Sequence, residues 1–334
     1  MPGRQPRVPQ IAGDAVRSLL AAVFPSDCRF CQASLFTLSR LPVCQGCLQT
    51  IHPIEFARCT RCGDLLPASE AEWGDACCAE CAQDLPPFER AVNFGAYSGA
   101  LRQLVHLLKY ERVRVAAKAL GHYTALACKD LCDEIEAGEL LLIPVPAYKS
   151  RLRTRGFNQA ELIARAARRE LEKILERRIV LDSTILLRTR FAGSQVARTA
   201  EERREQVRGA FKVLARPRVK GRRVLLVDDV MTTGATAAEC ARVLLQAGAT
   251  QVWVATPARA LGRDMASSTS SEKFPERLAP EVVRPPRLDG RPLPSRPAQP
   301  SLLPRAGAAP NLFELKAEAP PGPLFRGTYA NGES

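Results

Sequence analysis

The chain has 334 residues, which is enough for one domain of ordinary size, a smaller module and a tail. No apolar run approaches the roughly 18 residues that a membrane-spanning helix needs, which argues against membrane insertion. The formal net charge of +13 is concentrated in residues 147–223, which contain 22 Lys and Arg against 8 Asp and Glu. This excess indicates an anionic ligand or a nucleic acid as partner, and a solvated helix face is the alternative explanation.

Residues 1–24 are expected to form a separate N-terminal segment. Residues 18–24 are apolar, but the run is short, and Asp14 and Arg17 precede it closely. This pattern favours a short amphipathic helix over a secretory signal. We therefore expect a cytoplasmic protein.

Residues 25–85 are predicted to form a double zinc ribbon. They contain four Cys-x-x-Cys pairs: Cys28 and Cys31, Cys44 and Cys47, Cys59 and Cys62, Cys78 and Cys81. Each pair can present two thiolates from one tight turn, and two turns complete a tetrahedral Zn²⁺ site, so one or two structural zinc ions are expected. Disulfides are the alternative, but no secretory signal supports an oxidising compartment. The spacing leaves open which pairs combine, and Cys77 is a further candidate ligand.

Residues 88–262 are predicted to form an α/β domain around a parallel sheet. Short apolar runs typical of buried strands lie at residues 90–97, 140–145, 224–227 and 252–255. Helical periodicity lies between them, at residues 99–109, 113–135, 158–176 and 237–247. Asn158 is a candidate N-cap for the third of these helices. Strands that alternate with helices in this way indicate helices packed against a parallel sheet.

The segment from Val224 to Thr236 carries the strongest chemical signal. Asp228 and Asp229 follow a buried strand, and ligands of open α/β sheets bind at the carboxyl ends of strands. Carboxylates at this place suit ribose hydroxyls or a hydrated Mg²⁺ ion. A small-residue loop then opens a helix, where backbone N–H groups can bind a phosphate. Its residues are Thr232, Thr233, Gly234, Ala235 and Thr236. An N-capped loop after a buried strand, without a ligand, is the alternative interpretation.

This segment resembles the phosphoribosyl-pyrophosphate (PRPP) signature of type I phosphoribosyltransferases at every position. Pro144-Val145-Pro146 and the run from Arg155 to Gln159, together with the cysteine pairs, make the chain similar to the ComF family over approximately residues 20–260. Members of that family are phosphoribosyltransferase-like bacterial proteins linked to DNA uptake in natural competence. The resemblance therefore implies single-stranded DNA and DNA-uptake proteins as possible partners, in addition to PRPP.

The resemblance also implies roles for individual residues. Asp228 and Asp229 would meet the ribose hydroxyls and Mg²⁺, and the loop of residues 232–236 would hold the 5-phosphate. Residues 147–155 correspond in order to a pyrophosphate loop, and residues 188–208 to a mobile loop that closes over PRPP. The expected contacts from these two segments are Lys149, Arg151, Arg155, Gln195 and Arg203. For each arginine alone, a solvated face is an equally good explanation.

Two functions stay open on the sequence. The first is an enzyme that transfers phosphoribosyl from PRPP to an unknown acceptor with the help of Mg²⁺. Purine-salvage relatives carry an acidic general base where this chain has Thr232, so the base for such an acceptor is unassigned. The alternative is a non-catalytic competence accessory that binds single-stranded DNA and keeps a PRPP-sensing or nucleotide-sensing pocket. Residues 263–334 are rich in Pro, Ser, Arg and Ala and are predicted to be a disordered tail.

Overall fold

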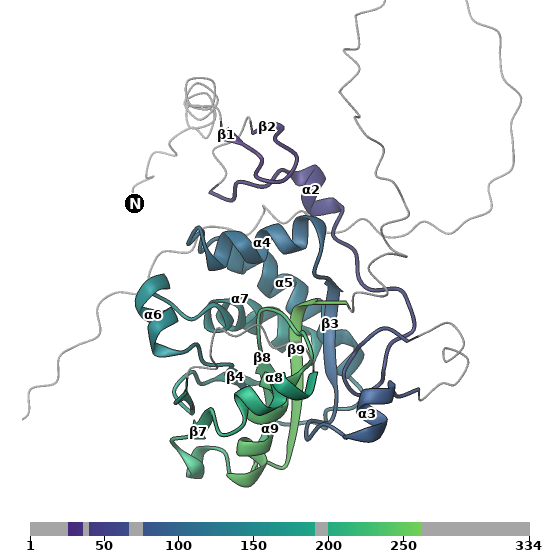
Figure 1. The fold of residues 1–334 in the computed structure, drawn as a ribbon, viewed down its shortest axis with the longest axis vertical. Helices are drawn as coiled ribbons and strands as arrows, with labels where there is room; N and C mark the ends of the chain where they lie inside the picture. The colour runs from purple at the N-terminus through teal and green to yellow at the C-terminus, as the bar shows by residue number, and fades with distance from the viewer. Residues whose placement is uncertain (1–25, 36–39, 67–75, 191–199, 262–334) are drawn as a thin grey trace, which may run out of the picture. The chain divides into compact units, whose positions relative to one another are not determined.

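The computed structural model describes residues 26–35, 40–66, 76–190 and 200–261 (Figure 1). All of them belong to one compact unit of the chain. The predictions for residues 1–24, for Gln195 and for the tail at residues 263–334 lie outside the described residues. No helix in the described ranges is both long enough and apolar enough to cross a membrane.

A five-stranded parallel sheet forms the centre of the α/β domain, as predicted. Its strands, in spatial order, are β3 (Ala91–Ala96), β9 (Gln251–Arg259), β8 (Arg223–Val227), β4 (Leu140–Pro144) and β5 (Ile179–Leu181). All five residues of β4 are buried, as are the last four of β8. The absence of polar residues from these runs follows from this burial, because both faces of a parallel sheet are covered.

Helices α4 (Gly99–Lys109), α5 (Ala116–Ala127), α7 (Gln159–Ile174) and α9 (Ala235–Gln246) cover the sheet (Figure 1). Gly121 lets α5 and α7 approach closely, because a Cβ atom there would lie 2.7 Å from the Cβ of Ala166. Asn158 occupies the N-cap position of α7 as predicted. Its amide nitrogen, however, donates to the carbonyl of Val145 (3.0 Å), so it ties the helix to the end of β4.

Three segments differ from the sequence-based expectation. The helix predicted at residues 113–135 ends at Ala127 and continues as a 3₁₀ turn, η2 (Cys128–Leu131). Leu131 and Ile135 remain buried, so their apolar spacing reflects core contacts and not a longer helix. Residues 149–155, expected as a loop, form helix α6 (Lys149–Arg155). Its Lys, Arg and Leu residues are good helix formers, and Gly156 ends the helix with a positive φ of 79°.

The third difference is the segment expected as a mobile loop, residues 188–208. Arg188 ends strand β6 (Leu186–Arg188), which pairs in antiparallel fashion with β7 (Phe211–Val213), and residues near the end of the segment form α8 (Ala200–Val207). A short 3₁₀ turn, η3 (Arg216–Arg218), leads towards β8. Part of the segment expected as a mobile loop is therefore regular structure.

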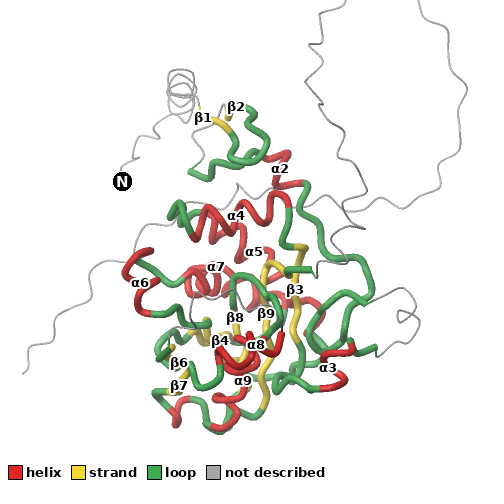
Figure 2. The backbone as a smooth tube through the Cα atoms, viewed as in Figure 1, coloured by secondary structure: helices red, strands yellow, loops and turns green. Residues whose placement is uncertain are grey.

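The cysteine-rich part of the chain is mostly loop, which Figure 2 shows by its colour. Its short elements are β1 (Ser26–Asp27), β2 (Ser34–Leu35), α2 (Gln45–Gln49) and α3 (Ala79–Gln83). Helices α2 and α3 begin directly after Cys44 and Cys78, so each contains the second cysteine of its pair. This local geometry fits zinc-ribbon turns.

Candidate functional site

The acidic pair lies at the carboxyl end of β8, where the sequence placed it. The strand ends at Val227, and Asp228 and Asp229 follow directly. The chain then pairs briefly with the end of β9, because the N–H of Met231 donates to the carbonyl of Ala258 (2.9 Å). Gly234, with φ of 77°, turns the chain into α9. Glycine suits this position because residues with a Cβ atom rarely adopt such a positive φ. A Cβ atom would in addition lie 2.9 Å from the end of the Met231 side chain.

Lys109 balances the charge of the acidic pair. This last residue of α4 places its Nζ 2.8 Å from Oδ1 of Asp229, and the two side chains are only 17% and 13% exposed. Burial alone would lower the pKa of Lys109, but Asp229 and, more weakly, Asp228 raise it above the usual lysine value. Lys109 is therefore protonated at neutral pH, and it forms an ion pair with Asp229. Lys109 is not evident as a site residue from the sequence, because a basic residue at a helix C-terminus is common for reasons of helix stability alone.

Burial disfavours the ionised form of Asp228. Burial, and next the negative charge of Asp229, raise the pKa of Asp228 to about 7. The backbone N–H of Asp229, which donates to Asp228 Oδ1 (2.8 Å), and the cations Lys109 and Arg188 oppose this rise. Desolvation is the dominant cause of the rise. Among the described residues, no cation forms an ion pair with this carboxylate. A cation placed here would favour the ionised form.

Two arginines extend the positive field over the acidic pair. The guanidinium carbon of Arg155, at the end of α6, lies 5.5 Å from the ring centre of Tyr110. Arg155 also interacts electrostatically with Asp229. Arg188 lies 5.2 Å from the ring of Phe211 and interacts electrostatically with Asp228. Burial lowers the pKa of both arginines, with repulsion from Arg151 as a further cause, yet a guanidinium stays charged at neutral pH.

Arg188 also holds an unused donor. Its Nε is buried without a hydrogen-bond partner in the described part of the chain. Such a buried N–H group costs free energy unless a ligand or water accepts from it. This cost is consistent with a site that receives an anion.

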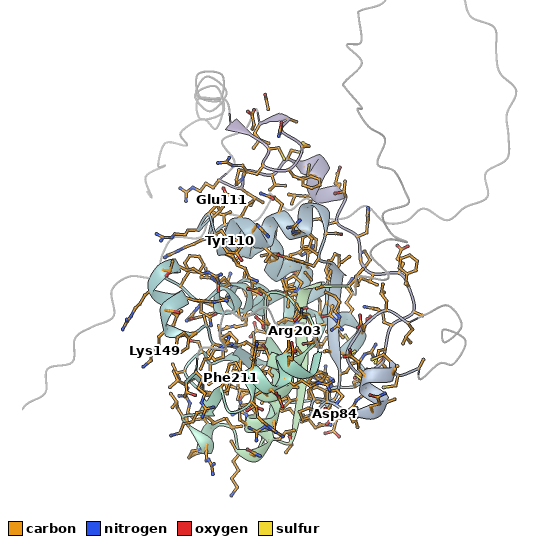
Figure 3. The ribbon with its side chains drawn as sticks, viewed as in Figure 1. Asp84, Tyr110, Glu111, Lys149, Arg203 and Phe211 are labelled. Atoms are coloured by element: carbon orange, nitrogen blue, oxygen red, sulfur yellow. The ribbon has the colours of Figure 1, made fainter. Side chains whose placement is uncertain are left out.

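The structure brings some predicted residues together and separates others. Arg155, at the end of α6, interacts electrostatically with Asp229, whereas Lys149 and Arg151 are exposed on the same helix. Arg203 is exposed on α8, and Figure 3 shows it on a different element from Lys149. In the loop after Met231, Thr232 is exposed while Thr233 and Thr236 are half-buried. The roles of these residues stay predictions.

The eight cysteines of the four pairs form two groups that could each hold a metal ion. The first is Cys28, Cys31, Cys44 and Cys47, and the second is Cys59, Cys62, Cys78 and Cys81. Within each group all four Sγ atoms lie within 4.8 Å of one another. Consecutive pairs therefore combine, which the spacing alone had left open.

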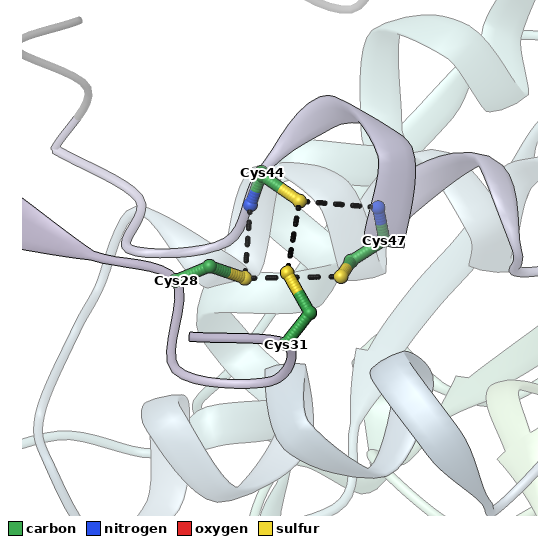
Figure 4. Close-up of side chains that lie close together, drawn as sticks. All are labelled: Cys28, Cys31, Cys44 and Cys47. Carbon is green, nitrogen blue, oxygen red and sulfur yellow. Dashed lines mark hydrogen bonds between the residues drawn. The ribbon is translucent and has the colours of Figure 1, made fainter. Parts of the chain in front are cut away.

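The geometry of both groups fits tetrahedral zinc. Four thiolates at about 2.3 Å from one Zn²⁺ ion place their sulfurs about 3.8 Å apart. The first group has Sγ distances of 3.8 Å for Cys28–Cys47 and 3.6 Å for Cys31–Cys44, as drawn in Figure 4. In the second, Cys62 and Cys78 are 3.6 Å apart, and Cys77 lies 3.9 Å from Cys59 as a fifth nearby sulfur.

Backbone donors support thiolates in the first group. The N–H of Cys44 donates to the sulfur of Cys28 (3.3 Å), and the N–H of Cys47 donates to the sulfur of Cys44 (3.4 Å) (Figure 4). Burial opposes ionisation of Cys28, but the surrounding backbone N–H groups outweigh it and lower its pKa to about 6. The thiolate is the form that binds zinc.

The chain is similar to several known proteins. A family model described as "Phosphoribosyl transferase domain" matches residues 163–279. The chain is 34% identical over 234 residues to the DNA utilization protein YhgH of Escherichia coli O157:H7, and the match covers 69% of this chain and 96% of that protein. It is 29% identical over 240 residues to competence protein F of Haemophilus influenzae, covering 71% and 98%.

One solved structure to which the chain is similar is a glutamine phosphoribosylpyrophosphate (PRPP) amidotransferase from B. subtilis, complexed with ADP and GMP. The identity is 26%, and the match covers 42% of this chain and 26% of that one, at a TM-score of 0.24. The chain thus spans about a quarter of that structure's length.

The raised pKa of Asp228 should make the stability of the folded protein depend on pH. Burial raises this pKa from a usual value near 3.8 to about 7, so the folded state binds a proton that the unfolded chain releases. The resulting penalty is absent below about pH 4, grows as pH rises to about 7, and is complete above that value. We expect Asp228→Asn to raise the melting temperature at pH 8, and this gain to shrink steadily towards pH 5.

Calorimetric scans at pH 5, 6, 7 and 8 without divalent cations measure this effect. Glu161→Gln is the matched control, because Glu161 is a carboxylate on α7 outside the acidic pair. The explanation is wrong if the Asn variant is less stable than wild type at pH 8, or if its gain does not depend on pH.

Proposed function

This chain belongs to the ComF family, together with competence protein F and the DNA utilization protein YhgH, and we propose that its α/β domain binds PRPP with Mg²⁺ and transfers the phosphoribosyl group. The observation that carries the proposal is the half-buried acidic pair beside the loop that opens α9. Asp228 and Asp229 directly follow β8, and Gly234 opens α9 six residues after the first and five after the second. Cations from α4, α6 and β6 surround the pair.

The pocket divides into an anion-binding loop and a carboxylate pair. The N–H groups at the start of α9, with the hydroxyls of Thr233 and Thr236, would hold the 5-phosphate of PRPP. The two carboxylates would accept hydrogen bonds from the ribose hydroxyls. Mg²⁺, held by the same carboxylates, would neutralise charge on the pyrophosphate as it leaves. The acceptor that bonds to the ribose carbon in its place is not identified by the site.

Positive side chains would bind the pyrophosphate end of the substrate. Arg155 on α6 interacts electrostatically with Asp229, and Lys149 and Arg151 precede it on the same helix. The unpaired Nε of Arg188 offers one further buried donor. Lys109 would hold Asp229 in a fixed orientation before the substrate arrives. Gln195 and Arg203 keep their proposed role in the closing segment.

We also propose that each four-cysteine group holds one structural zinc ion. Four thiolates leave no open coordination position for catalysis. We expect protein purified under reducing conditions to contain two zinc equivalents per chain. Cys59→Ser with Cys62→Ser should lose one equivalent and lower thermal stability, because zinc binding is coupled to folding. Elemental analysis measures the metal content, and a zinc-free wild-type protein that is fully folded would contradict the proposal.

The PRPP pocket is tested by removing charge from the acidic pair. Asp228→Asn with Asp229→Asn keeps the side-chain volumes but removes both charges. Loss of a charge-assisted hydrogen bond costs about 1.5–3 kcal/mol, so PRPP affinity in the presence of Mg²⁺ should fall more than roughly tenfold. Thr233→Val should weaken binding with or without Mg²⁺, because it acts on the 5-phosphate.

Titration calorimetry with PRPP, with and without Mg²⁺, separates these two effects. Glu161→Gln serves again as the control, with unchanged affinity expected. If the folded double variant binds PRPP as tightly as the wild type, the acidic pair is structural and the proposed transfer activity loses its main support.

A second candidate function, binding of single-stranded DNA, is favoured by the charge of α6. Several cations of residues 147–223 form ion pairs in the described structure. On α7, Arg165 pairs with Glu161 and Arg168 with Glu172, one helical turn away. Helix α6, by contrast, contains four cations and no acidic residue, and most of its side chains are exposed. It is therefore the best candidate for contact with a phosphate backbone.

This candidate predicts salt-dependent binding of single-stranded DNA. Arg151→Glu with Arg153→Glu should weaken it and reduce the dependence on salt concentration, by about 0.7 in log–log slope for each phosphate that the variant no longer neutralises. Arg165→Glu with Arg168→Glu is the control, because these cations are already paired on α7. Fluorescence anisotropy with a labelled oligonucleotide across a series of salt concentrations gives the slopes. Equal effects of the two double variants would contradict a role for α6.

A further inference from the structure

The second four-cysteine group is built into the core of the α/β domain. Three of its cysteines, Cys59, Cys62 and Cys81, are buried in the same hydrophobic cluster as residues of β4 and β8 and as Met231. The N–H of Ala91, the first residue of β3, donates to the carbonyl of Arg61 (2.7 Å). This ribbon therefore shares one packed interior with the sheet.

Arg259 is the buried link between this group and the sheet. It is the last residue of β9 and is 2% exposed. Its guanidinium donates to the carbonyl of Cys62 (3.1 Å) and forms an ion pair with Asp64 (3.0 Å). It also lies 4.0 Å from the sulfur of Cys62. A zinc ion held by four thiolates carries two net negative charges, so a buried cation at this distance would stabilise the metal-bound group.

The backbone of the same segment positions the start of the loop at residues 232–236. Met231 forms a β-bridge with Arg259, donates to the carbonyl of Ala258 (2.9 Å) and accepts from the N–H of Ala260 (2.8 Å). The side chain of Met231 is buried against Gly234. Because Thr232 follows Met231 directly, the end of β9 that Arg259 anchors also fixes where the loop begins.

The described residues around the first four-cysteine group show no comparable link to the end of β9. Within the described residues, none of its cysteines belongs to the core cluster that contains Met231. Its contacts with the α/β domain include a hydrogen bond from Tyr123 Oη to the carbonyl of Leu48 (3.4 Å). They also include an ion pair between the exposed side chains of Arg29 and Glu111 at 3.7 Å. The two groups therefore differ in attachment although their ligand sets are the same.

We propose that Arg259 is a positioning residue that couples the metal state of the second cysteine group to the sugar-phosphate loop. Loss of the metal, or of the guanidinium, would release the end of β9 and loosen the segment from Met231 to Thr236. The consequence for PRPP rests on the proposed function, but the consequence for the loop backbone does not.

The test compares Arg259→Gln with Arg259→Lys and with Arg29→Gln as the control in the full chain. Amide hydrogen exchange of residues 231–236 is measured without ligand, together with zinc content and PRPP affinity. We expect at least roughly tenfold faster exchange and at least roughly tenfold weaker PRPP binding in Arg259→Gln. Arg259→Lys should recover part of both effects, because it restores the charge but not the two-pronged contact. Arg29→Gln should change neither.

A second experiment removes metal ligands from each cysteine group in turn. Cys59→Ser with Cys62→Ser should accelerate exchange of residues 231–236 far more than Cys28→Ser with Cys31→Ser does. Equal acceleration by the two cysteine variants overturns the coupling, as does unchanged exchange in a folded Arg259→Gln protein. If Arg259→Gln does not fold, Asp64→Asn replaces it, because it removes only the ion partner. A wild-type protein that fails to bind PRPP refutes the proposed function, while the exchange data still decide the coupling.

Discussion

The site depends on two adjacent carboxylates held at the end of a buried strand. Placing them there costs free energy, because both carboxylates lose water and repel each other. The same two effects raise the pKa of Asp228 to about 7. Lys109 offsets part of this cost through its 2.8 Å contact with Asp229, and Arg155 and Arg188 add a weaker field. Asp228 has no such partner among the described residues. The lack of a direct counter-ion at Asp228 favours binding of a further cation there, and the surrounding cations favour an anionic substrate.

The sequence predicted the parts of this site that are local. The apolar run before Asp228, the two carboxylates and the Gly234 turn are contiguous, so strand length and turn chemistry place them without tertiary information. The cysteine pairs were equally local, and only their combination required the fold. Lys109 and Arg188 could not be found, because α4 and β6 reach the carboxyl end of β8 only through the sheet topology. A charge at a helix end or a strand end does not by itself predict which residue it will meet.

The errors in the fold prediction have a related cause. A resemblance between families transfers the order of functional segments better than their local conformation. Residues 149–155 were expected as a loop because of their position before α7, yet their composition favours the helix that forms, α6. Likewise Leu131 and Ile135 continued an apolar spacing that the core uses through η2 and the turn after it. Local propensity and tertiary burial decided these segments, and order along the chain did not.

The two cysteine groups show how the same ligand set can serve different structural purposes. Short loop-rich segments bury too little apolar surface to fold alone, which is why metals commonly stabilise them. The first group meets this need locally, since its cysteines stand apart from the cluster that holds Met231. The second supplies Cys59, Cys62 and Cys81 to that cluster and faces the buried guanidinium of Arg259. A perturbation of its metal therefore acts on the interior of the α/β domain, beside the loop that would hold a phosphate.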